Sequence, residues 1–258
     1  MPATDVTTGY GPGPAPARPH RVGPSTATAG PRTPPPGPST REDDEPGPED
    51  TPHPRPSAEF GEPHAAGPAG LLGHPATWGA VTTPVGSFRL EPVRLDHDLP
   101  LVHRWMNDPA VADFWELAGP PDRTEDHLRS QLPGDGRSVP CLGVLDGTPI
   151  GYWEIYRADL DPVARHYPAR PHDTGIHLLV GAAADRGRGL GSALLRAVAD
   201  LILDRRPACE RVVAEPDLRN TPSVAAFLSA GFRFAAEIEV PGKRAALVIR
   251  DRALRDVL

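Results

Sequence analysis

The stretch HLLVGAAADRGRGLGSALLRAVADL, residues 177–201, contains an apolar run, a loop with two arginines and alternating glycines, and a run with helical spacing. This pattern predicts a strand that passes through a glycine loop into a helix. The first backbone N–H groups of a helix have no partner within the helix and point along its axis. Glycines let an anion approach such groups closely. The stretch therefore predicts an anion-binding site at a strand-to-helix junction.

The beginning of the chain differs in composition from the rest. Eighteen of the 35 prolines lie within residues 1–70, and large apolar side chains are scarce there. Such a segment buries too little apolar surface to offset its chain entropy. We therefore predict a disordered tail rich in proline, glycine and alanine over residues 1–84. Residues 85–258 have the size of a single domain.

Charge and composition exclude several classes of function. A formal net charge of −7, with no stripe of Lys or Arg along a predicted helix, argues against a nucleic-acid partner. No apolar run is long enough to span a membrane and no signal-peptide pattern is present, so we expect a cytoplasmic protein with no membrane partner. Cys141 and Cys209 lack the spacing of a metal site or a disulfide framework, so neither is expected.

The hydrophobic patterns after residue 85 predict a mixed α/β sheet flanked by helices. The dipeptide Asp146-Gly147 suits a tight hairpin turn. The expected strands are 87–95, two within 141–156, 174–181, 211–216, 233–240 and 244–250, and the expected helices are 96–108, 109–117, 123–132, 192–206 and 220–232. Residues 157–173 are expected to form a loop.

The glycine loop RGRGLG, residues 186–191, fits neither of two common phosphate motifs. Its glycines alternate as GxGxG, whereas the dinucleotide fingerprint needs GxGxxG, and the P-loop sequence GxxxxGK[ST] is absent. The pattern Arg186-x-x-Gly189-x-Gly191 after an apolar strand resembles the pyrophosphate loop of the GNAT acyltransferases. The resemblance implies that acyl-CoA is the co-substrate. It assigns cofactor binding to Val180, Arg186, Gly187, Arg188, Gly189 and Gly191.

A second block, NTPSVAAFLSAGF at residues 220–232, strengthens this resemblance. In the GNAT family a helix that opens with Asn and ends in Gly-Phe flanks the pantetheine arm of the cofactor. Asn220 and Phe227 occupy the matching positions, with one predicted strand between this helix and the loop. The resemblance therefore adds these two residues to the cofactor site and implies a single GNAT domain.

Four further blocks are similar to the GNAT branch that acylates hydroxylamines or lysine side chains in hydroxamate siderophore assembly, of the aerobactin, alcaligin, desferrioxamine and mycobactin type. They are HRWMNDPAVADFW (103–115), GYWEIY (151–156), DTGIHLLVG (173–181) and EPDLRN (215–220). The resemblance implies acetyl- or succinyl-CoA as donor, a small amine or hydroxylamine as acceptor, and acceptor-binding roles for Trp105, Asn107, Trp115, Tyr152 and Tyr156.

Some of these aromatic residues also fit a role in the core, since tryptophans at helical spacing are commonly packed inside. In GYWEIY the strand period places Tyr152, Glu154 and Tyr156 on one face and Trp153 and Ile155 on the other. A face with two phenols and a carboxylate is costly to bury without partners. We therefore expect the polar face to line a cleft.

The resemblance implies that His177 is the general base and that Asp217 is its partner. A nitrogen that attacks a thioester must lose a proton, and the leaving thiolate must gain one, so a histidine held by a carboxylate suits the reaction. Glu154 is the alternative base. No GxSxG motif is present, and Cys141 has no base beside it in the sequence, so we expect direct transfer without an acyl-enzyme.

Two other functions fit the same sequence. One is a GNAT N-acetyltransferase for a different amine, of the aminoglycoside or polyamine type. The other is a non-catalytic acyl-CoA sensor or scaffold that recruits partners through the tail. The set of His177, Asp217 and Glu154 argues against the second, because a binding module has no need of it.

Overall fold

The computed structural model describes residues 71–132 and 136–257. Most of the predicted tail, residues 1–70, lies outside these residues. From residue 71 onward the chain is folded: Leu72 and Trp78 are buried, and Val81–Thr83 pairs with the next strand. The folded part therefore begins before the predicted boundary at residue 85, because these few apolar side chains pack into the core despite their proline-rich neighbours.

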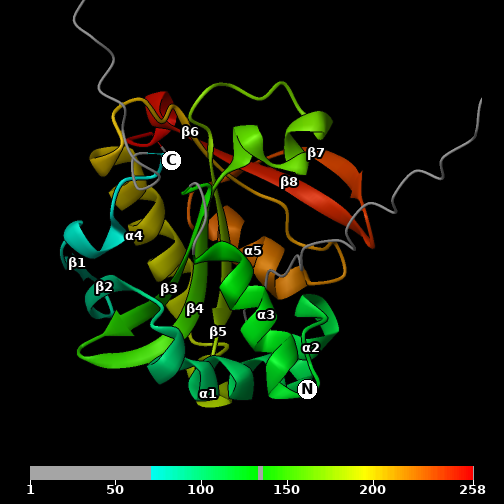
Figure 1. Ribbon diagram of the computed structural model, residues 1–258. Helices are drawn as coiled ribbons and strands as arrows, with labels where there is room; N and C mark the ends of the chain where they lie inside the picture. The colour runs from blue at the N-terminus through cyan, green and yellow to red at the C-terminus, as the bar shows by residue number, and fades with distance from the viewer. Residues whose placement is uncertain (1–70, 133–135, 258) are drawn as a thin grey trace, which may run out of the picture. The chain divides into compact units, whose positions relative to one another are not determined.

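One eight-stranded sheet has the strand order β1-β2-β3-β4-β5-β6-β8-β7 (Figure 1). Neighbouring strands are antiparallel except β5 and β6, which are parallel and are connected through α4. The strands are β1 Val81–Thr83, β2 Gly86–Pro92, β3 Ser138–Leu145, β4 Thr148–Arg157, β5 Thr174–Val180, β6 Arg211–Ala214, β7 Arg233–Val240 and β8 Lys243–Asp251. The helices are α1 Leu95–Met106, α2 Pro109–Trp115, α3 Pro121–Gln131, α4 Leu190–Arg205 and α5 Thr221–Ser229.

The predicted order of these elements is confirmed, with two differences. The hairpin between β3 and β4 turns at Asp146-Gly147, where both residues have positive φ angles of 47° and 84°. Strand β1 was not predicted, because three residues are too few to show a period. The predicted loop 157–173 contains two 3-10 turns, η3 Ala158–Leu160 and η4 Pro162–His166; elsewhere such turns are η2 Pro75–Thr77, η5 Ala183–Asp185 and η6 Arg252–Leu254.

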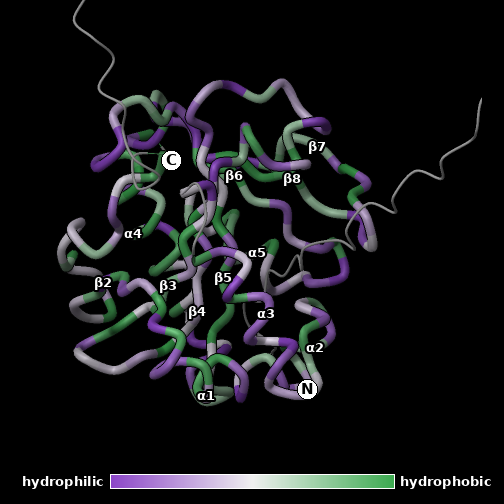
Figure 2. The backbone as a smooth tube through the Cα atoms, in the orientation of Figure 1, coloured by the Kyte–Doolittle hydropathy of each residue, from purple (hydrophilic) through white to green (hydrophobic). Residues whose placement is uncertain are grey.

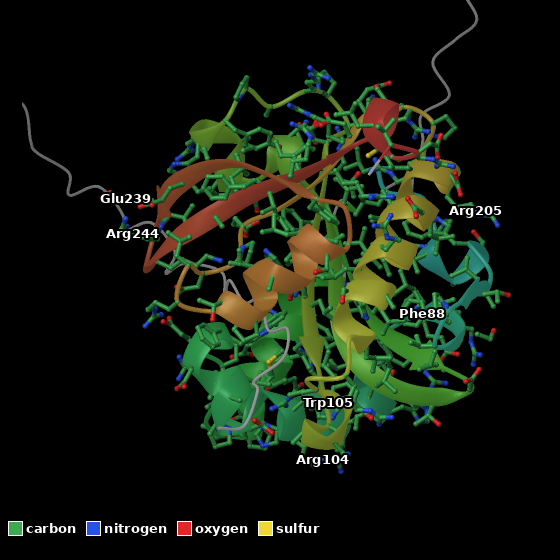
Figure 3. The ribbon with its side chains drawn as sticks, turned by 180° about the vertical axis from the view of Figure 1, so that it is seen from behind. Phe88, Arg104, Trp105, Arg205, Glu239 and Arg244 are labelled. Atoms are coloured by element: carbon green, nitrogen blue, oxygen red, sulfur yellow. The ribbon has the colours of Figure 1, made fainter. Side chains whose placement is uncertain are left out.

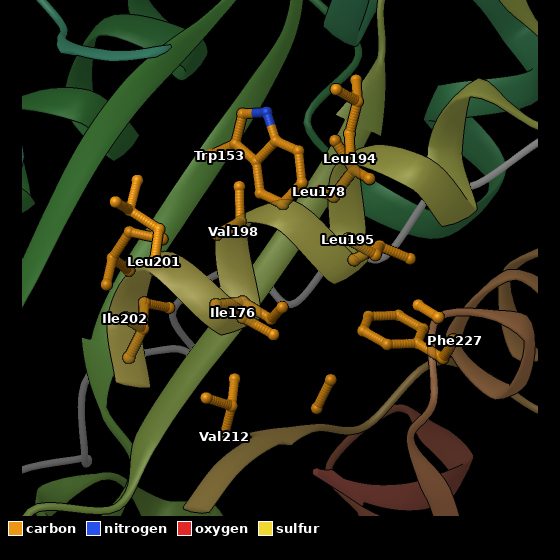
Figure 4. Close-up of a cluster of buried hydrophobic side chains, with 14 of the residues drawn as sticks. Trp153, Ile176, Leu178, Leu194, Leu195, Val198, Leu201, Ile202, Val212 and Phe227 are labelled. Atoms are coloured by element: carbon orange, nitrogen blue, oxygen red, sulfur yellow. The ribbon is translucent and has the colours of Figure 1, made fainter. Parts of the chain in front are cut away.

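One face of the sheet carries the main hydrophobic core and is covered by α4 and α5 (Figures 3 and 4). Alternate residues of β4 and β5, including Trp153, Ile176 and Leu178, point to this side. They meet Leu195 and Phe227 from the two helices. Figure 2 shows the matching hydrophobic stretches along the central strands.

The opposite face is covered by α1, α2 and α3 (Figure 1). Its core includes Trp105 and Trp115 from the helices and Tyr152 and Leu179 from the sheet. Trp105, which is labelled in Figure 3, lies on this side. Its ring is so close to Gly181 that any side chain at that position would collide with it. The alternation predicted for GYWEIY is confirmed, since Tyr152 and Trp153 belong to the cores on opposite faces.

Strands β5 and β6 separate soon after they begin to pair. Their parallel ladder contains two registered pairs, Thr174↔Val212 and Gly175↔Val213. Beyond these pairs β5 continues to Val180, whereas β6 ends at Ala214. A fork therefore opens in the sheet beside His177 and Glu215, the residues two places beyond the last pair.

Candidate active site

His177 lies at the fork between two carboxylates. Its Nδ1 is 2.8 Å from Glu154 Oε2, and its Nε2 is 2.7 Å from Glu215 Oε1. Glu154 faces His177 directly across the β4–β5 ladder, and Glu215 follows the last residue of β6. All three residues are at most 5% exposed. A carboxylate accepts hydrogen bonds, so both ring nitrogens of His177 donate and the ring is an imidazolium.

Each carboxylate has further partners. Glu154 Oε1 accepts hydrogen bonds from His127 Nε2 at 2.6 Å and from the Tyr152 hydroxyl at 2.9 Å. Glu215 Oε2 accepts a hydrogen bond from the Tyr156 hydroxyl at 2.8 Å. Lys243 from β8 lies 3.9 Å from Glu215 Oε1, and its Nζ donates to the Glu215 carbonyl. The cluster thus continues on both sides of His177.

The charged groups shift one another's pKa values. Burial lowers the pKa of His177, but Glu215 and Glu154 outweigh this effect and raise it to about 9. Burial raises the pKa of Glu215, whereas His177, Lys243 and Tyr156 lower it, with a net result of about 2. Burial also raises the pKa of Glu154, but His127 and His177 bring it well below its ordinary range. At neutral pH the site therefore holds a cation between two anions.

The predicted pairing of His177 with Asp217 is wrong. The Asp217 carboxylate binds the Arg219 guanidinium, with Oδ2 at 2.7 Å from Nη2, and Glu215 takes the place at His177. The register of the parallel ladder explains the difference, because it brings residue 215, rather than 217, beside residue 177. Glu154 was predicted as the alternative base, and it is a direct partner of His177.

The predicted acceptor residues fall into two groups. The first group is at most 6% exposed and contains Trp105, Trp115, Tyr152 and Tyr156. The expectation that the polar face of β4 lines an open cleft is therefore wrong. The phenols can be buried because the two glutamates accept hydrogen bonds from their hydroxyl groups. Asn107 is exposed, and its side chain ties the end of α1 to the Gly119 backbone.

The loop after β5 is braced from within by Arg186. The Arg186 guanidinium donates to the carbonyls of Val180 and Gly181 and forms an ion pair with Asp108 at 3.0 Å. The side chain is 5% exposed. The Arg186 guanidinium is thus engaged inside the loop, and its predicted contact with the cofactor phosphates stays a prediction. Arg188 is exposed beside it.

Gly187 and Gly189 give this loop its path into α4. Their φ angles are 71° and 75°, in the left-handed region that favours glycine. Gly189 is the N-cap of α4, and Gly191 lies buried in the first turn. The first turn of α4 therefore presents backbone N–H groups at the end of the loop, as expected for an anion site.

The helix α5 begins at the second predicted cofactor residue. The Asn220 side chain caps α5 by accepting a hydrogen bond from the Ser223 backbone N–H, and Asn220 is 3% exposed. Phe227 is fully buried and packs edge-on against Phe232, with ring centroids 5.1 Å apart. Both residues thus shape α5 from inside the fold.

The two loop arginines allow a direct prediction. Arg186→Gln is expected to lower the free energy of unfolding by about 2–3 kcal/mol, because it removes a buried set of charge-assisted hydrogen bonds and leaves Asp108 without its partner. Arg188→Gln is expected to change it by less than about 0.5 kcal/mol, since this side chain is exposed. Urea unfolding of both variants measures the two free energies of unfolding. Equal losses in the two variants would contradict a stabilising role of the buried Arg186 side chain.

Two pockets lie beside the cluster. The first is lined by Glu215 and by Asp161, Pro162, Val163, His166, Val240 and Pro241, and its interior has room for about one water-sized group. Burial, and then the charge of Glu215, raise the pKa of Asp161. The second is lined by Asp217, Leu218, Arg219, Gly242, Lys243 and Arg244. Both pockets thus carry charged side chains.

Membrane-spanning helices and metal-binding clusters are both absent from the folded residues 71–132 and 136–257. Within 71–132 and 136–257, no helix is long and apolar enough to cross a membrane. In the same ranges, no group of three or more His, Cys, Asp or Glu side chains is arranged to hold a metal ion.

The family follows from the sequence. A model of the acetyltransferase (GNAT) domain family matches residues 94–240. The chain belongs to the GNAT acetyltransferase family. The match contains most of the sheet, the glycine loop and all members of the cluster except Lys243. The predicted GNAT fold and the predicted class of enzyme, an acyltransferase, are confirmed.

Similar proteins place this GNAT enzyme among acyltransferases. Lysine N-acyltransferase MbtK of Mycobacterium sp. (strain MCS) is 35% identical over 169 residues, which cover 66% of this chain and 69% of that protein. N(6)-hydroxylysine O-acetyltransferase of Escherichia coli is 38% identical over 149 residues, 58% of this chain and 47% of that protein. The solved structure of an uncharacterized protein from Bacillus halodurans has a TM-score of 0.65 and 32% identity, and covers 69% of this chain and 92% of its own.

Proposed function

We propose that this GNAT enzyme transfers an acyl group from acyl-CoA to the hydroxylated nitrogen of an N-hydroxylated diamine or of an N-hydroxylated lysine-like side chain, forming a hydroxamate of the siderophore type. The observation that carries the proposal is the buried His177 held between Glu154 and Glu215 where β5 and β6 separate. The names of two relatives, a lysine N-acyltransferase and a hydroxylysine acetyltransferase, support the same class of acceptor.

The proposed reaction is a direct transfer. The acceptor nitrogen attacks the thioester carbonyl, so that a C–N bond forms and the C–S bond breaks. The nitrogen loses one proton and the sulfur gains one, which leaves free CoA thiol. His177 takes the proton after its own proton has moved into the solvent or onto a carboxylate, and the two glutamates hold the ring in place.

The acyl-CoA is proposed to bind along the fork. Its diphosphate would meet the backbone N–H groups at the start of α4, where Gly187 and Gly189 leave room. The exposed Arg188 would add a charge-assisted contact. Arg186 would contribute indirectly, by holding the loop in this shape. Asn220 and Phe227 would support the pantetheine arm through the position of α5.

The acceptor is proposed to enter through the pocket lined by Asp161 and Glu215. The two carboxylates favour a positively charged or proton-donating group, and the pocket admits a group of the size of water. An amine or hydroxylamine nitrogen meets both requirements. Glu215 would connect such a group to His177, because it borders the pocket and binds the ring.

A thiol-release assay tests the function. We expect acetyl- or succinyl-CoA to release thiol at least about tenfold faster with N6-hydroxylysine or N-hydroxycadaverine than with lysine or cadaverine, because a site shaped for a hydroxyl discriminates against its absence. The His177→Gln variant serves as the background control. Faster release with plain amines such as kanamycin would contradict the proposal and favour another GNAT specificity, and binding of acyl-CoA without any release would favour a sensor.

A further inference from the structure

Helix α3 reaches into the cluster through one buried histidine. His127 is 4% exposed, and its Nε2 lies 2.6 Å from Glu154 Oε1. We propose that His127 is a positioning residue, which holds the Glu154 carboxylate so that its other oxygen faces Nδ1 of His177. This inference rests on the proposed function in one respect, namely that His177 takes the proton.

The two oxygens of Glu154 are used unequally. Oε1 accepts hydrogen bonds from His127, from Tyr152 and, at 2.9 Å, from the Gln131 amide. Oε2 binds His177. The Gln131 amide is itself oriented, because its oxygen accepts a hydrogen bond from Ser138 Oγ at 2.6 Å. With three donors on Oε1, rotation of the carboxylate would break several hydrogen bonds, so Oε2 stays aimed at His177.

His127 and Gln131 are one helical turn apart, so both project from the same side of α3. His127 is buried and Gln131 is half-buried, and burial of such polar side chains is costly unless they are hydrogen-bonded. Glu154 satisfies this requirement for both residues. The pair thus couples the position of α3 to the carboxylate behind His177.

The hydrogen bonds also fix which nitrogen of His127 carries a proton. A carboxylate accepts, so the proton lies on Nε2. Nδ1 is buried and has no hydrogen-bond partner among the residues that the structure describes. A proton there would have no acceptor within the folded part of the chain. His127 therefore acts as a single N–H donor to Glu154.

Trp115 packs against the rings of both His127 and His177. Its ring meets His127 edge-on, with centroids 6.4 Å apart, and meets His177 in the same way at 6.2 Å. The indole is fully buried. Since both rings pack against one rigid neighbour, a change in the plane of His127 is constrained by packing as well as by its hydrogen bond.

Loss of the His127 donor has a predictable electrostatic effect. Less of the negative charge of Glu154 would then be compensated at Oε1, so the carboxylate would bind the proton on His177 more strongly. The groups that face or surround His177 are Glu154, Tyr152 and Tyr156 from β4, Glu215 after β6, His127 from α3, Lys243 from β8 and Asp161 before η4. Of these, His127 and Tyr152 share Glu154 Oε1, and replacement of His127 leaves the others in place.

The test compares donorless variants with one that retains a donor. His127→Leu and His127→Phe remove the N–H, and His127→Gln supplies an amide N–H in its place. The titration of the His177 ring is followed by NMR in each free protein, with His177→Gln used to assign the signal. We expect a midpoint near pH 9 in the unmodified protein, a rise of about one pH unit in the donorless variants, and little change in His127→Gln.

Turnover supplies a second measurement. In the donorless variants kcat at pH 7.5 is expected to fall about tenfold, in proportion to the fraction of unprotonated His177, with KM for acyl-CoA within about twofold. His127→Gln should restore most of kcat. A purely structural role would lower stability without this shift of the pH profile.

Three outcomes would overturn the inference. They are an unchanged His177 midpoint in a folded donorless variant, equal effects in His127→Gln and His127→Leu, and loss of folding in both donorless variants while His127→Gln folds. The NMR titration needs neither substrate. If the proposed acyl acceptor is wrong, the thiol-release assay fails in the unmodified protein, whereas the titration still tests His127.

Discussion

Replacement of His177 by glutamine is expected to lower kcat by about 10²–10⁴-fold, because it removes the group that takes the acceptor proton. In the unmodified protein kcat/KM should rise with pH up to about 9, since the unprotonated ring accumulates as the pH approaches its pKa. This rise of kcat/KM with pH should be absent in the His177→Gln variant. Thiol release at saturating acyl-CoA from pH 6 to 10 measures both effects.

The positive charge of His177 also stabilises the folded protein, so the stability of the His177→Gln variant must be measured beside its turnover. The folded protein holds a proton on His177 up to about pH 9, whereas an unfolded histidine loses it near 6.5. The stabilisation is therefore fully present below pH 6.5 and is lost as the pH rises through 9. His177→Gln removes the cation that the two buried carboxylates share, so thermal unfolding and CoA binding must show that the variant is folded. A folded variant with nearly unchanged turnover would exclude His177 as the base.

Replacement of Glu215 by glutamine is expected to lower kcat by about 10²-fold or more, whereas Asp217→Asn is expected to stay within about threefold. Glu215 binds the His177 ring, borders the acceptor pocket and is 3% exposed. Asp217 binds Arg219, whose side chain is 69% exposed, and such an ion pair contributes little. The two substitutions are chemically matched and lie two residues apart, so each controls for the other.

The reverse order of effects would contradict this assignment. If Asp217→Asn abolished turnover and Glu215→Gln did not, the sequence-based pairing of His177 with Asp217 would apply in the working enzyme. The His177 titration separates the two cases, because Glu215→Gln should lower the midpoint of His177 and Asp217→Asn should leave it nearly unchanged.

Several features of the fold were accessible from local sequence. Asp146-Gly147 forms a hairpin because both positions adopt positive φ, which Asp tolerates and Gly favours. The alternation in GYWEIY separates Tyr152 from Trp153 because successive strand residues face opposite sides. Each of these results depends on a few neighbouring residues, so a short pattern is enough to predict it.

His127 could not be recognised in the same way. The sequence shows it within a predicted helix, 27 residues from Glu154. Its pairing depends on how α3 packs over β4, and no local pattern contains that information. The only available signal was a polar residue on the side of α3 that also carries the buried Leu128 and Thr124.

The sequence by itself determined the GNAT architecture, the glycine loop before α4 and the presence of His177 on a buried strand. The tertiary structure decided which groups contact that histidine. It also decided that the Arg186 side chain is buried within the loop and the Arg188 side chain is exposed. Glu215 rather than Asp217 reaches His177 because the ladder between β5 and β6 aligns residues 175 and 213. Arg186 turns inward because Asp108 and two carbonyls lie within reach of its guanidinium. Periodicity and turn chemistry act between neighbours, whereas register and side-chain pairing arise when distant segments pack together.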